Sequence, residues 1–590
     1  MRELRTLLPY FRPYRRGLIL GLILVVVGNL FTIAGPYVLK LAIDALEHDL
    51  RPDLIVRYAG LIVLVAALAG AARFGMREFL NGISRRMETD LRNDLFDHFL
   101  RLPAEFYDEW RTGDLMSRVT NDVLAVRQVA GPAIMYLVNT TTISILALSL
   151  MVWIDVPLTL LSMAPMLMVP PVVFLFGQRI HDRFEAIQAQ FGELSNFVQE
   201  NLTGVRIVKA YTREEAQKRR FARLNAEYMS HNMGLARIWG AFHPSLMLLT
   251  GLGAVVVLWF GGRQVIAGSM TLGDFVAFAF YLTLLTWPMI ALGWVTNLFQ
   301  RGAASMGRIN ELMRIRPAIA DPEDPKRLTH PRGEIEFEDV SFRYPGSEHW
   351  ALRHVSFRIE PGQTLAVVGS TASGKTTLVR LISRLYEATQ GSVRLDGIDV
   401  RRLRLSDLRA AMAVVPQEPF LFSMRLRHNI QLQRSETESK TMDLDRALDV
   451  AQLRPTLDVL PNRFDTRIGE RGVTLSGGQK QRATLARALI RNAPILILDD
   501  ALSAVDMETE TAILDGLRRY AAERTAIIIS HRVSAVRNAD MILVLEDGRI
   551  VERGRHAELV ARRGAYATLL ERQLLAREIE SDRVAAARTE

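Results

Sequence analysis

The chain has 590 residues, a formal net charge of +9 and no cysteine. This length is enough for two or more domains, and the lack of cysteine excludes disulfides and thiolate metal sites. The positive charge alone would also suit a nucleic-acid-binding protein. Many of the arginines, however, flank long apolar runs in the first ~300 residues, which is typical of a membrane protein.

The N-terminal residues 1–16 are basic and precede an apolar stretch too long for the core of a signal peptide, so we expect a cytoplasmic elbow. A membrane-spanning helix needs ~20 mainly apolar residues. Runs such as 18–27 and 254–260 carry no charge, which makes buried helices of a soluble protein the weaker alternative. Six windows are long enough to span a membrane: residues 17–39, 55–76, 130–153, 157–176, 239–261 and 275–299.

Basic residues between the windows indicate their orientation. Segments 84–127 and 178–238 are rich in Arg, whereas residues 154–156 form one whole connection and Arg263 is the only basic residue of another. The positive-inside rule therefore places the N-terminus, both long segments and everything after residue 300 in the cytoplasm. The sequence thus predicts a multi-pass protein of the cell (inner) membrane.

The two long cytoplasmic segments have helical character. Residues 78–102 and 180–201 are poor in Gly and Pro and show helical periodicity, so the membrane helices should continue into the cytoplasm. Each contains an aromatic and charged turn, at residues 106–122 and 200–214, that suits docking on another domain; a solvated helix hairpin is the alternative. Polar residues inside spans are functional candidates, although a helix–helix hydrogen bond is the commoner role of a lone His. They are Asn29, Asn139, residues 140–142, His243 and Asn297.

A soluble domain follows a linker. Residues 314–333 are rich in Pro and charge, which is typical of a linker. Residues 335–344 then alternate with a period of two, as an antiparallel edge strand would. The apolar run 495–498 predicts a central strand that delivers Asp499 and Asp500 to the carboxyl edge of a sheet.

The loop 369–376, GSTASGKT, matches the phosphate-binding pattern G-x-x-x-x-G-K-[ST]. Gly369 and Gly374 allow backbone N–H groups to converge on phosphate oxygens, and the next helix adds the positive end of its dipole. Lys375 would reach the β- and γ-phosphates, and the hydroxyl of Thr376 would bind Mg²⁺. Asp499 would hold the same ion through water. The loop and this strand together predict ATP and Mg²⁺ as cofactors.

Residues 475–479, LSGGQ, match the signature motif of the ATP-binding cassette (ABC) transporters, which is far more specific than a phosphate-binding loop. Six spans followed by this cassette resemble an exporter-type half-transporter, and the resemblance covers nearly the whole chain. It implies a six-helix α transmembrane domain with long cytoplasmic extensions, followed by an α/β nucleotide-binding domain with antiparallel β and helical subdomains. The implied domains are an elbow at 1–16, a transmembrane domain with two coupling helices at 17–313, a linker at 314–333, a nucleotide-binding domain at 334–575 and a charged helical tail at 576–590.

The resemblance also assigns roles to single residues. It implies that Tyr344 stacks on adenine, that Gln417 senses Mg²⁺ and that His531 is the switch histidine; Glu470 would lie in an exporter-specific loop and residues 503–506 in the D-loop. It implies that two cassettes face head to tail, so that the signature turn of one completes the ATP site of the other. Closing this sandwich would turn the membrane cavity outward. The implied nucleotide-binding residues are Tyr344, Gly369, Ser370, Thr371, Ala372, Ser373, Gly374, Lys375, Thr376, Thr377, Ser476, Gly477, Gly478 and Gln479, with Thr376, Gln417 and Asp499 at the metal and Asp500, His531 and Gln417 in catalysis.

Two positions depart from the family pattern. The family's general base is a Glu directly after the Mg²⁺-binding Asp, and here that position is Asp500. Its carboxylate is withdrawn by about 1.5 Å, one carbon–carbon bond, and a base misplaced by this much loses on the order of 10²-fold in rate. We therefore expect this site to hydrolyse ATP slowly. The intact signature beside such a site resembles heterodimeric exporters with one degenerate site, which implies a second half-transporter that carries a catalytic Glu; a homodimer with a slow or water-bridged Asp is the alternative. Ala372 stands where Gly is frequent, which restricts the backbone slightly.

These features predict one subunit of an ATP-driven exporter, an ATPase that moves amphipathic or hydrophobic drugs, peptides or lipids out of the cytoplasm or inner leaflet. The alternatives are an ABC protein that gates or regulates a complex without pumping, and a siderophore-type importer of the same architecture. Six spans argue against a soluble ABC ATPase acting on DNA or translation. The expected partners are a second half-transporter, the solute and the lipid bilayer, with no nucleic acid.

Overall fold

The computed structural model describes residues 2–48, 51–432, 444–469, 472 and 474–575. Glu470 and the expected tail 576–590 lie outside these residues. The chain forms two compact units. The helical unit comprises Met1–Leu100 and Thr112–Ile315, and the α/β unit comprises Arg101–Arg111 and Arg316–Glu590. Six long helices followed by an α/β domain confirm the predicted fold class.

The described residues of the helical unit include six apolar helical runs of 43 to 53 residues. At 1.5 Å per residue, even 43 residues extend over ~65 Å, about twice the thickness of the hydrocarbon core. The predicted continuation of the helices is found in both segments, because one helix covers Pro52–Arg101 and another covers Val169–Thr203. The runs are Arg2–Glu47, Pro52–Arg101, Thr112–Ile154, Val156–Thr203, Glu214–Ile266 and Leu272–Arg314.

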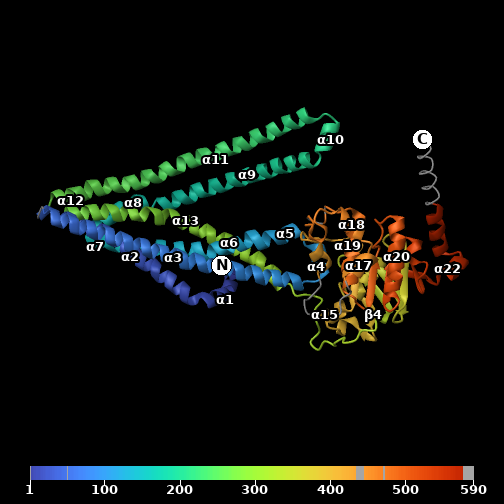
Figure 1. Cartoon of the computed structure of the whole chain (residues 1–590). Coiled ribbons are helices and arrows are strands. Elements are labelled where there is room, and N and C mark those ends of the chain that lie inside the picture. The colour runs from blue at the N-terminus through green and yellow to red at the C-terminus, as the bar shows by residue number, and fades with distance from the viewer. Residues whose placement is uncertain (1, 49–50, 433–443, 470–471, 473, 576–590) are drawn as a thin grey trace. The chain divides into compact units, whose positions relative to one another are not determined.

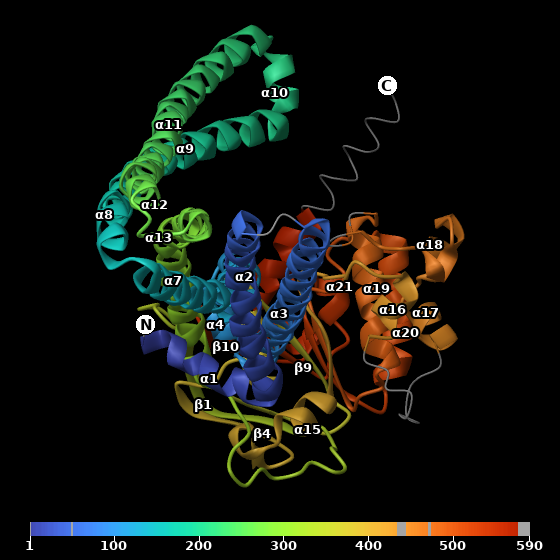
Figure 2. The same cartoon turned by 90° about the vertical axis from the view of Figure 1, so that its left-hand side faces the viewer.

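Two of the long helices, α9 and α11, run side by side and are joined by the short α10 (Figure 1, Figure 2). The third run is interrupted by π-helical turns at Arg118–Asp122 and Val129–Ala133, and the second of these contains Pro132, which cannot donate a helix hydrogen bond. The helices of this unit are α1 (Leu8–Phe11), α2 (Arg15–His48), α3 (Pro52–Arg101), α5 (Thr112–Ser117), α6 (Val123–Gln128), α7 (Ile134–Ile154), α8 (Val156–Met166), α9 (Val169–Thr203), α10 (Val205–Ala210), α11 (Glu214–Val256), α12 (Gly262–Ile266) and α13 (Leu272–Arg314).

Polar contacts fasten the N-terminal elbow and join the spans. The hydroxyl of Tyr10 donates to Asp94 at 2.7 Å, which holds the elbow against α3. Asn29 is buried in α2, and its amide donates to the backbone carbonyl of Asn139 in α7 at 3.1 Å. A hydrogen bond between two spans accounts for this buried Asn without a transported solute.

Two sheets are present in the part of the α/β unit that the structure describes. The smaller has the order β2-β1-β4-β5, and the larger has the order β10-β9-β3-β8-β7-β6, in which all neighbours except β10 and β9 are parallel. The strands are β1 (Ile335–Arg343), β2 (Trp350–Ile359), β3 (Thr364–Gly369), β4 (Gln390–Leu395), β5 (Ile398–Asp399), β6 (Met412–Val415), β7 (Ile495–Asp499), β8 (Thr525–Ile529), β9 (Met541–Glu546) and β10 (Arg549–Gly554). The helices are α4 (Ala104–Glu109), α14 (Lys375–Ile382), α15 (Leu405–Ala410), α16 (Leu426–Ile430), α17 (Leu444–Val450), α18 (Arg454–Val459), α19 (Gly477–Ile490), α20 (Met507–Ala521), α21 (Val533–Val536) and α22 (His556–Arg562).

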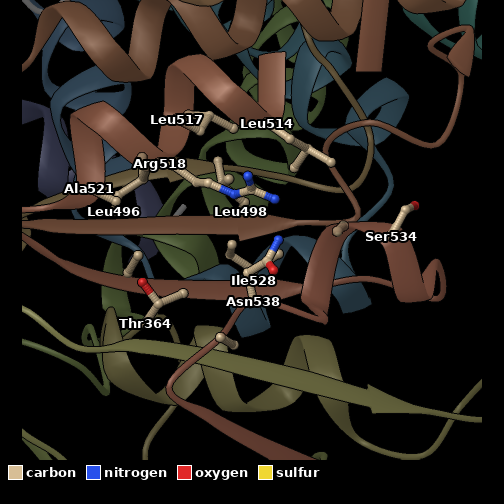
Figure 3. Close-up of a pocket in the computed structure, with 13 residues that line it drawn as sticks. Thr364, Leu496, Leu498, Leu514, Leu517, Arg518, Ala521, Ile528, Ser534 and Asn538 are labelled. Carbon is tan, nitrogen blue, oxygen red and sulfur yellow. The ribbon is translucent and has the colours of Figure 1, made fainter. Parts of the chain in front are cut away.

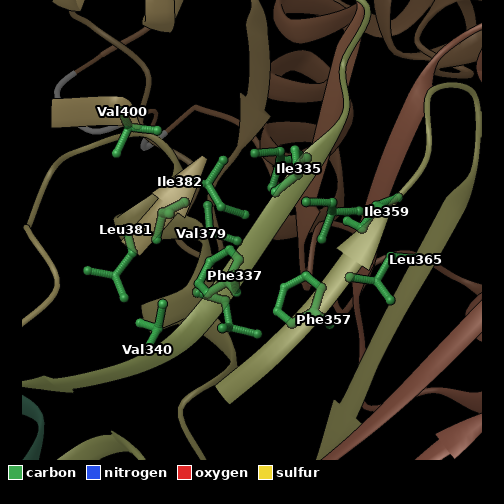
Figure 4. Packing of buried hydrophobic residues seen from close by; sticks show 14 of the residues in the cluster. Ile335, Phe337, Val340, Phe357, Ile359, Leu365, Val379, Leu381, Ile382 and Val400 are labelled. Carbon is green, nitrogen blue, oxygen red and sulfur yellow. The ribbon is translucent and has the colours of Figure 1, made fainter. Parts of the chain in front are cut away.

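The position of β7 inside the larger sheet confirms the prediction of a central strand, whereas the prediction of an edge strand at residues 335–344 is wrong. β1 is antiparallel, as expected, but it pairs with β2 on one side and β4 on the other. A period-two pattern indicates that one face of the strand is buried, but it does not indicate how many strands pair with it. The rings of Phe337 and Phe357 stack across β1 and β2 at 4.5 Å, and Val379 of α14 packs in the same cluster (Figure 4). The phosphate-loop helix therefore rests on a rigid core.

The segment predicted as a linker is bound to the α/β unit by backbone hydrogen bonds. Lys326 donates to the carbonyl of Arg402 at 2.8 Å and accepts from the N–H of Arg404 at 3.1 Å. Asp396 accepts from the N–H groups of Arg332 and Gly333 at 2.8 and 3.0 Å. Much of this segment thus follows the surface of the α/β unit.

The turn that contains α4 belongs to the α/β unit although it lies between two long helices in the sequence. Asp108 accepts a hydrogen bond from the hydroxyl of Tyr386, and Ala104 packs against the core cluster that contains Phe337. Burial, assisted by this hydrogen bond, raises the pKa of Tyr386. These contacts hold the first part of the predicted turn 106–122 in the α/β unit, and its role in docking stays a prediction.

Candidate nucleotide-binding site

Three parallel strands end at one edge of the larger sheet and bring the predicted site together. β3 leads into the glycine loop, β7 ends in Asp499 and is followed by Asp500, and His531 follows β8. Because the strand order is β3-β8-β7, the segment that carries His531 lies between the other two. Ligands bind at the carboxyl ends of such strands, so the fold gathers residues that are far apart in the sequence.

Gly369 and Gly374 bound the phosphate loop in conformations that L side chains rarely adopt. Their φ angles are +150° and +99°. A Cβ on Gly369 would overlap the carbonyl oxygen of Leu545, and one on Gly374 would lie 2.5 Å from that of Ala351. The φ angles and the close carbonyl oxygens therefore both require glycine at these two positions. The loop can then turn tightly in front of the N-terminus of α14, where an anion is favoured.

Ala372 lies in the same loop in a left-handed conformation, with a φ of +64°. This conformation costs a non-glycine residue about 1–2 kcal/mol relative to the right-handed region, whereas glycine adopts it readily. The restriction expected at this position from the sequence thus takes the form of a strained backbone.

The side chain of Lys375 folds back over the loop. Its Nζ donates to the carbonyl oxygens of Gly369 at 3.1 Å and Ser370 at 2.6 Å, and to Oγ of Ser373 at 3.3 Å. Burial lowers the pKa of Lys375, while the carboxylates of Asp499 and Asp500 favour its charged form. The ammonium group is therefore held inside the loop, where it can bind phosphate oxygens.

The three predicted metal residues, Thr376, Gln417 and Asp499, line one cavity. Oγ1 of Thr376 donates to Oδ1 of Asp499 at 3.2 Å. Asp499 is only 3% exposed, and burial is the main cause that raises the pKa of its carboxyl group. A hydroxyl, a carboxylate and an amide oxygen fit a hard cation such as Mg²⁺, whose charge would favour the ionised form of Asp499.

Tyr344 lies directly after β1 and beside α14. Its hydroxyl is 3.1 Å from Oγ1 of Thr377 and accepts a hydrogen bond from Arg380 at 3.1 Å. Its ring meets that of Tyr386 edge to face, with centroids 5.2 Å apart. The side chain is thus fixed next to the phosphate-loop helix, and its stacking on adenine stays a prediction.

The predicted catalytic residues Asp500 and His531 face each other. Asp500 begins the turn after β7 with a φ of +48°, and its N–H donates to the carbonyl of Ile529 at 2.8 Å. Oδ1 of Asp500 lies 2.9 Å from Nδ1 of His531. A carboxylate oriented by a neighbouring imidazole is an arrangement suited to positioning an attacking water.

The signature turn forms the N-terminus of α19. The Oγ of Ser476 accepts from the N–H of Gln479 at 3.3 Å, and the N–H of Ser476 donates to Oε1 of Gln479 at 2.9 Å, which is a complete capping box. A Cβ on Gly478 would lie 2.7 Å from the carbonyl of Ala504. Of the described residues, those that line the metal-residue cavity include none of the signature turn. That the signature serves a different ATP molecule stays a prediction.

Three arginines of the same cavity, Arg380, Arg409 and Arg491, were missed by sequence reasoning. Arg380 follows Thr376 by four positions, so both lie on one face of α14, and this spacing was a usable signal. Arg409 and Arg491 come from separate segments, and the side chain of Arg491 donates to the carbonyl of Arg409 at 2.8 Å. Only the folded chain brings these two residues together.

A second pocket of the α/β unit lies between α20, β7 and β8 (Figure 3). Arg518 is the one charged residue among those described that line it, and none of the predicted site residues does. A wall of Leu, Ile and Ala does not suit a phosphate, so this pocket is no part of the nucleotide site. Its apolar residues include Leu496, Leu498, Leu514, Leu517 and Ile528.

Comparison with protein families divides the chain as the structure does. Residues 18–289 match the family described as ABC transporter transmembrane region. Residues 352–503 match the family described as ABC transporter. The first match lies in the sequence of the helical runs, and the second includes the glycine loop and the signature turn.

Curated relatives extend the similarity over nearly the whole chain. The chain is 38% identical over 569 residues to the probable multidrug resistance ABC transporter ATP-binding/permease protein YheI of Bacillus subtilis, covering 96% of this chain and 97% of that protein. It is 37% identical over 577 residues to the multidrug resistance-like ATP-binding protein MdlA of Escherichia coli, with coverages of 98% and 97%. It is 33% identical over 564 residues to an ATP-dependent lipid A-core flippase of Syntrophus aciditrophicus, with coverages of 95% and 93%. A solved structure of a bacterial Atm1-family ABC exporter with ATP bound has the same fold, with a TM-score of 0.75, 28% identity and coverages of 95% and 99%.

Proposed function

Because this chain belongs to the ABC transporter family, we propose that it exports amphipathic, drug-like or lipid-like solutes from the cytoplasm or the inner leaflet. It is one half of an ABC exporter, and its cassette is an ATPase coupled to transport. Its six membrane helices and its family make it a multi-pass protein of the cell membrane, as predicted. The half-transporter acts with a second half, because the signature turn and the phosphate loop serve different ATP molecules.

The proposed substrate class rests on two observations. The spans expose many large apolar side chains and few fixed charges, which suits solutes that partition into a bilayer. The relatives are named as multidrug resistance proteins and lipid A-core flippases. Both names support export or flipping of apolar molecules over the gating, regulatory and importer alternatives.

The main support for ATP-driven transport is the cavity that Thr376, Gln417 and Asp499 line together. Mg²⁺, when bound there, would neutralise charge that develops on the β- and γ-phosphates. Lys375 binds the phosphates from inside the loop, and Asp500 beside His531 orients the attacking water. Gln417 lines the same cavity, where it can respond to the metal.

We further propose that the ATP site built on Asp500 is slow and that the chain's signature completes a faster site on a second subunit. The support is the shortened carboxylate at the position of the general base. The comparisons give no support to a heterodimer, and the relatives' names favour a multidrug or lipid exporter without specifying a second kind of subunit. A homodimer with slow turnover is therefore the competing arrangement.

Export is tested in inside-out vesicles that contain the full-length chain with its second half. We expect ATP-dependent accumulation of a fluorescent amphipathic dye or a labelled phospholipid. Lys375→Ala should abolish accumulation, because the loop loses the cation that binds the phosphates. ATP hydrolysis without accumulation of any dye, peptide or lipid would instead support the gating or regulatory alternative.

The slow-site proposal is tested by steady-state ATPase measurements. The chain purified alone should hydrolyse ATP weakly. In a complex with a half-transporter that has Glu at the position equivalent to Asp500, Glu→Gln in that subunit should nearly abolish hydrolysis, whereas Asp500→Ala should reduce it much less. Equal losses from the two substitutions would show that both sites contribute alike.

A further inference from the structure

A cavity of about 490 Å³ in the helical unit lies where three spans reach the cytoplasmic side. Its walls come from the end of the second predicted span, the start of the third and the end of the sixth. Arg77 of α3, Arg127 of α6 and Arg301 of α13 all line it. In the positive-inside orientation these ends face the cytoplasm, so the cavity lies at the depth of the lipid headgroups of the inner leaflet.

The cavity carries an excess of positive charge. Of the described residues that line it, none is Asp or Glu. Nε of Arg127 lies 3.4 Å from Glu88, but this one carboxylate also pairs with Arg92 at 2.7 Å and Arg85 at 3.5 Å. Among the contacts described for the chain, neither Arg77 nor Arg301 has a salt bridge. Unpaired guanidinium groups at the edge of an apolar region favour an anion that can accept two hydrogen bonds from one side chain.

The membrane side of the same cavity is apolar and aromatic. The rings of Tyr136 and Trp294 meet edge to face with centroids 4.9 Å apart, and both residues line the cavity. Trp294 is 44% exposed, whereas Leu298 beside it is buried. A cationic rim next to an aromatic wall matches a molecule with an anionic head and an apolar body.

We propose that this cavity binds the anionic group, a phosphate or a carboxylate, of amphipathic solutes and thereby selects anionic over cationic substrates of the exporter. Arg77 and Arg301 bind the anion, Arg127 adds charge from behind, and Trp294 contacts the apolar body. The proposal rests on the proposed export function, but binding is measurable without transport.

The test is equilibrium binding of labelled lysophosphatidate to the full-length chain in phosphatidylcholine nanodiscs without ATP. We expect lysophosphatidylcholine with the same acyl chain, and a quaternary ammonium amphipath of equal tail length, to bind at least tenfold more weakly. The double substitution Arg77→Gln/Arg301→Gln should weaken lysophosphatidate binding at least tenfold. Arg77→Lys/Arg301→Lys keeps the charge and should recover part of the affinity. Arg263→Gln, at the opposite end of the spans, should have no effect.

Competition by inorganic phosphate distinguishes a site for free anions from a site for lipid headgroups. We expect phosphate to displace labelled lysophosphatidate only at concentrations far above that of the lipid. Equal binding of the anionic and zwitterionic lipids, an unchanged affinity of the double Gln variant, or phosphate binding as tight as that of the lipid would overturn the proposal. If ATP-dependent export is normal but substitution of Arg77 and Arg301 does not change lipid binding, the proposed role of the cavity is wrong while the export function stands. Specific binding without ATP-dependent accumulation of any solute would refute export and leave the site in place.

Discussion

Replacing Asp500 by Glu should raise the steady-state ATPase rate of the full-length chain by about 10–100-fold. The added methylene advances the carboxylate by ~1.5 Å toward the attacking water, and a gain of this size corresponds to a correctly placed base. The hydrogen bond from the N–H of Asp500 to Ile529 involves only the backbone, so it can persist with Glu at this left-handed position. Phosphate release under saturating Mg-ATP measures the change.

A matched control for this substitution is Asp515→Glu. Asp515 lies on the exposed side of α20 and pairs only with its neighbour Arg518, among the ion pairs described for the chain. It should leave the rate unchanged, whereas Asp500→Asn should lower it further. If Asp500→Glu leaves the rate at the level of the unmodified chain, the carboxylate of Asp500 already reaches the water and the slow-site proposal is wrong.

Replacing Gly374 by Ala should destabilise the nucleotide-binding domain by about 2–5 kcal/mol and weaken ATP binding at least tenfold. The estimate combines ~1–2 kcal/mol for a side chain in a left-handed backbone with ~1–3 kcal/mol for overpacking. The new methyl group would lie 2.5 Å from the carbonyl oxygen of Ala351 and 2.8 Å from Leu352, so the loop has to move away from β2. Thermal unfolding and equilibrium binding of a non-hydrolysable ATP analogue measure the two effects.

The opposite substitution at a neighbouring position serves as the comparison. Ala372→Gly removes a side chain from a left-handed residue and should stabilise the domain, or leave its stability unchanged, while ATP binding persists. Unfolding and binding of the Gly374→Ala protein that match those of the unmodified chain would mean that the loop relaxes without difficulty. The strain described for this loop would then have no energetic consequence.

Local sequence patterns were sufficient for the spans and for the phosphate loop because both depend on short segments. Twenty apolar residues define a span, and Gly369, Gly374 and Lys375 act within a few residues of one another. The neighbours of a strand depend on the whole sheet, which is why β1 was expected at an edge and is found between β2 and β4. The membership of α4 in the α/β unit likewise depends on Tyr386, far away in the sequence.

The candidate site shows the same division. Thr376 and Asp499 followed from the loop and strand patterns, and Arg380 could have been added from its spacing on α14. Arg409 and Arg491 could not, because no periodicity connects them before folding. The signature residues were recognised by family resemblance, since the side chains of a Ser-Gly-Gly-Gln turn do not by themselves indicate a nucleotide site.

The capping box of Ser476 and Gln479 supplies hydrogen-bond partners at the N-terminus of α19 from within the chain itself. The first N–H groups of a helix need acceptors, and here the side chain of Ser476 already satisfies one of them. A γ-phosphate that reaches this turn therefore competes with an acceptor that is already in place. At this N–H group, binding of a γ-phosphate would therefore gain less than at an N–H group that has no acceptor.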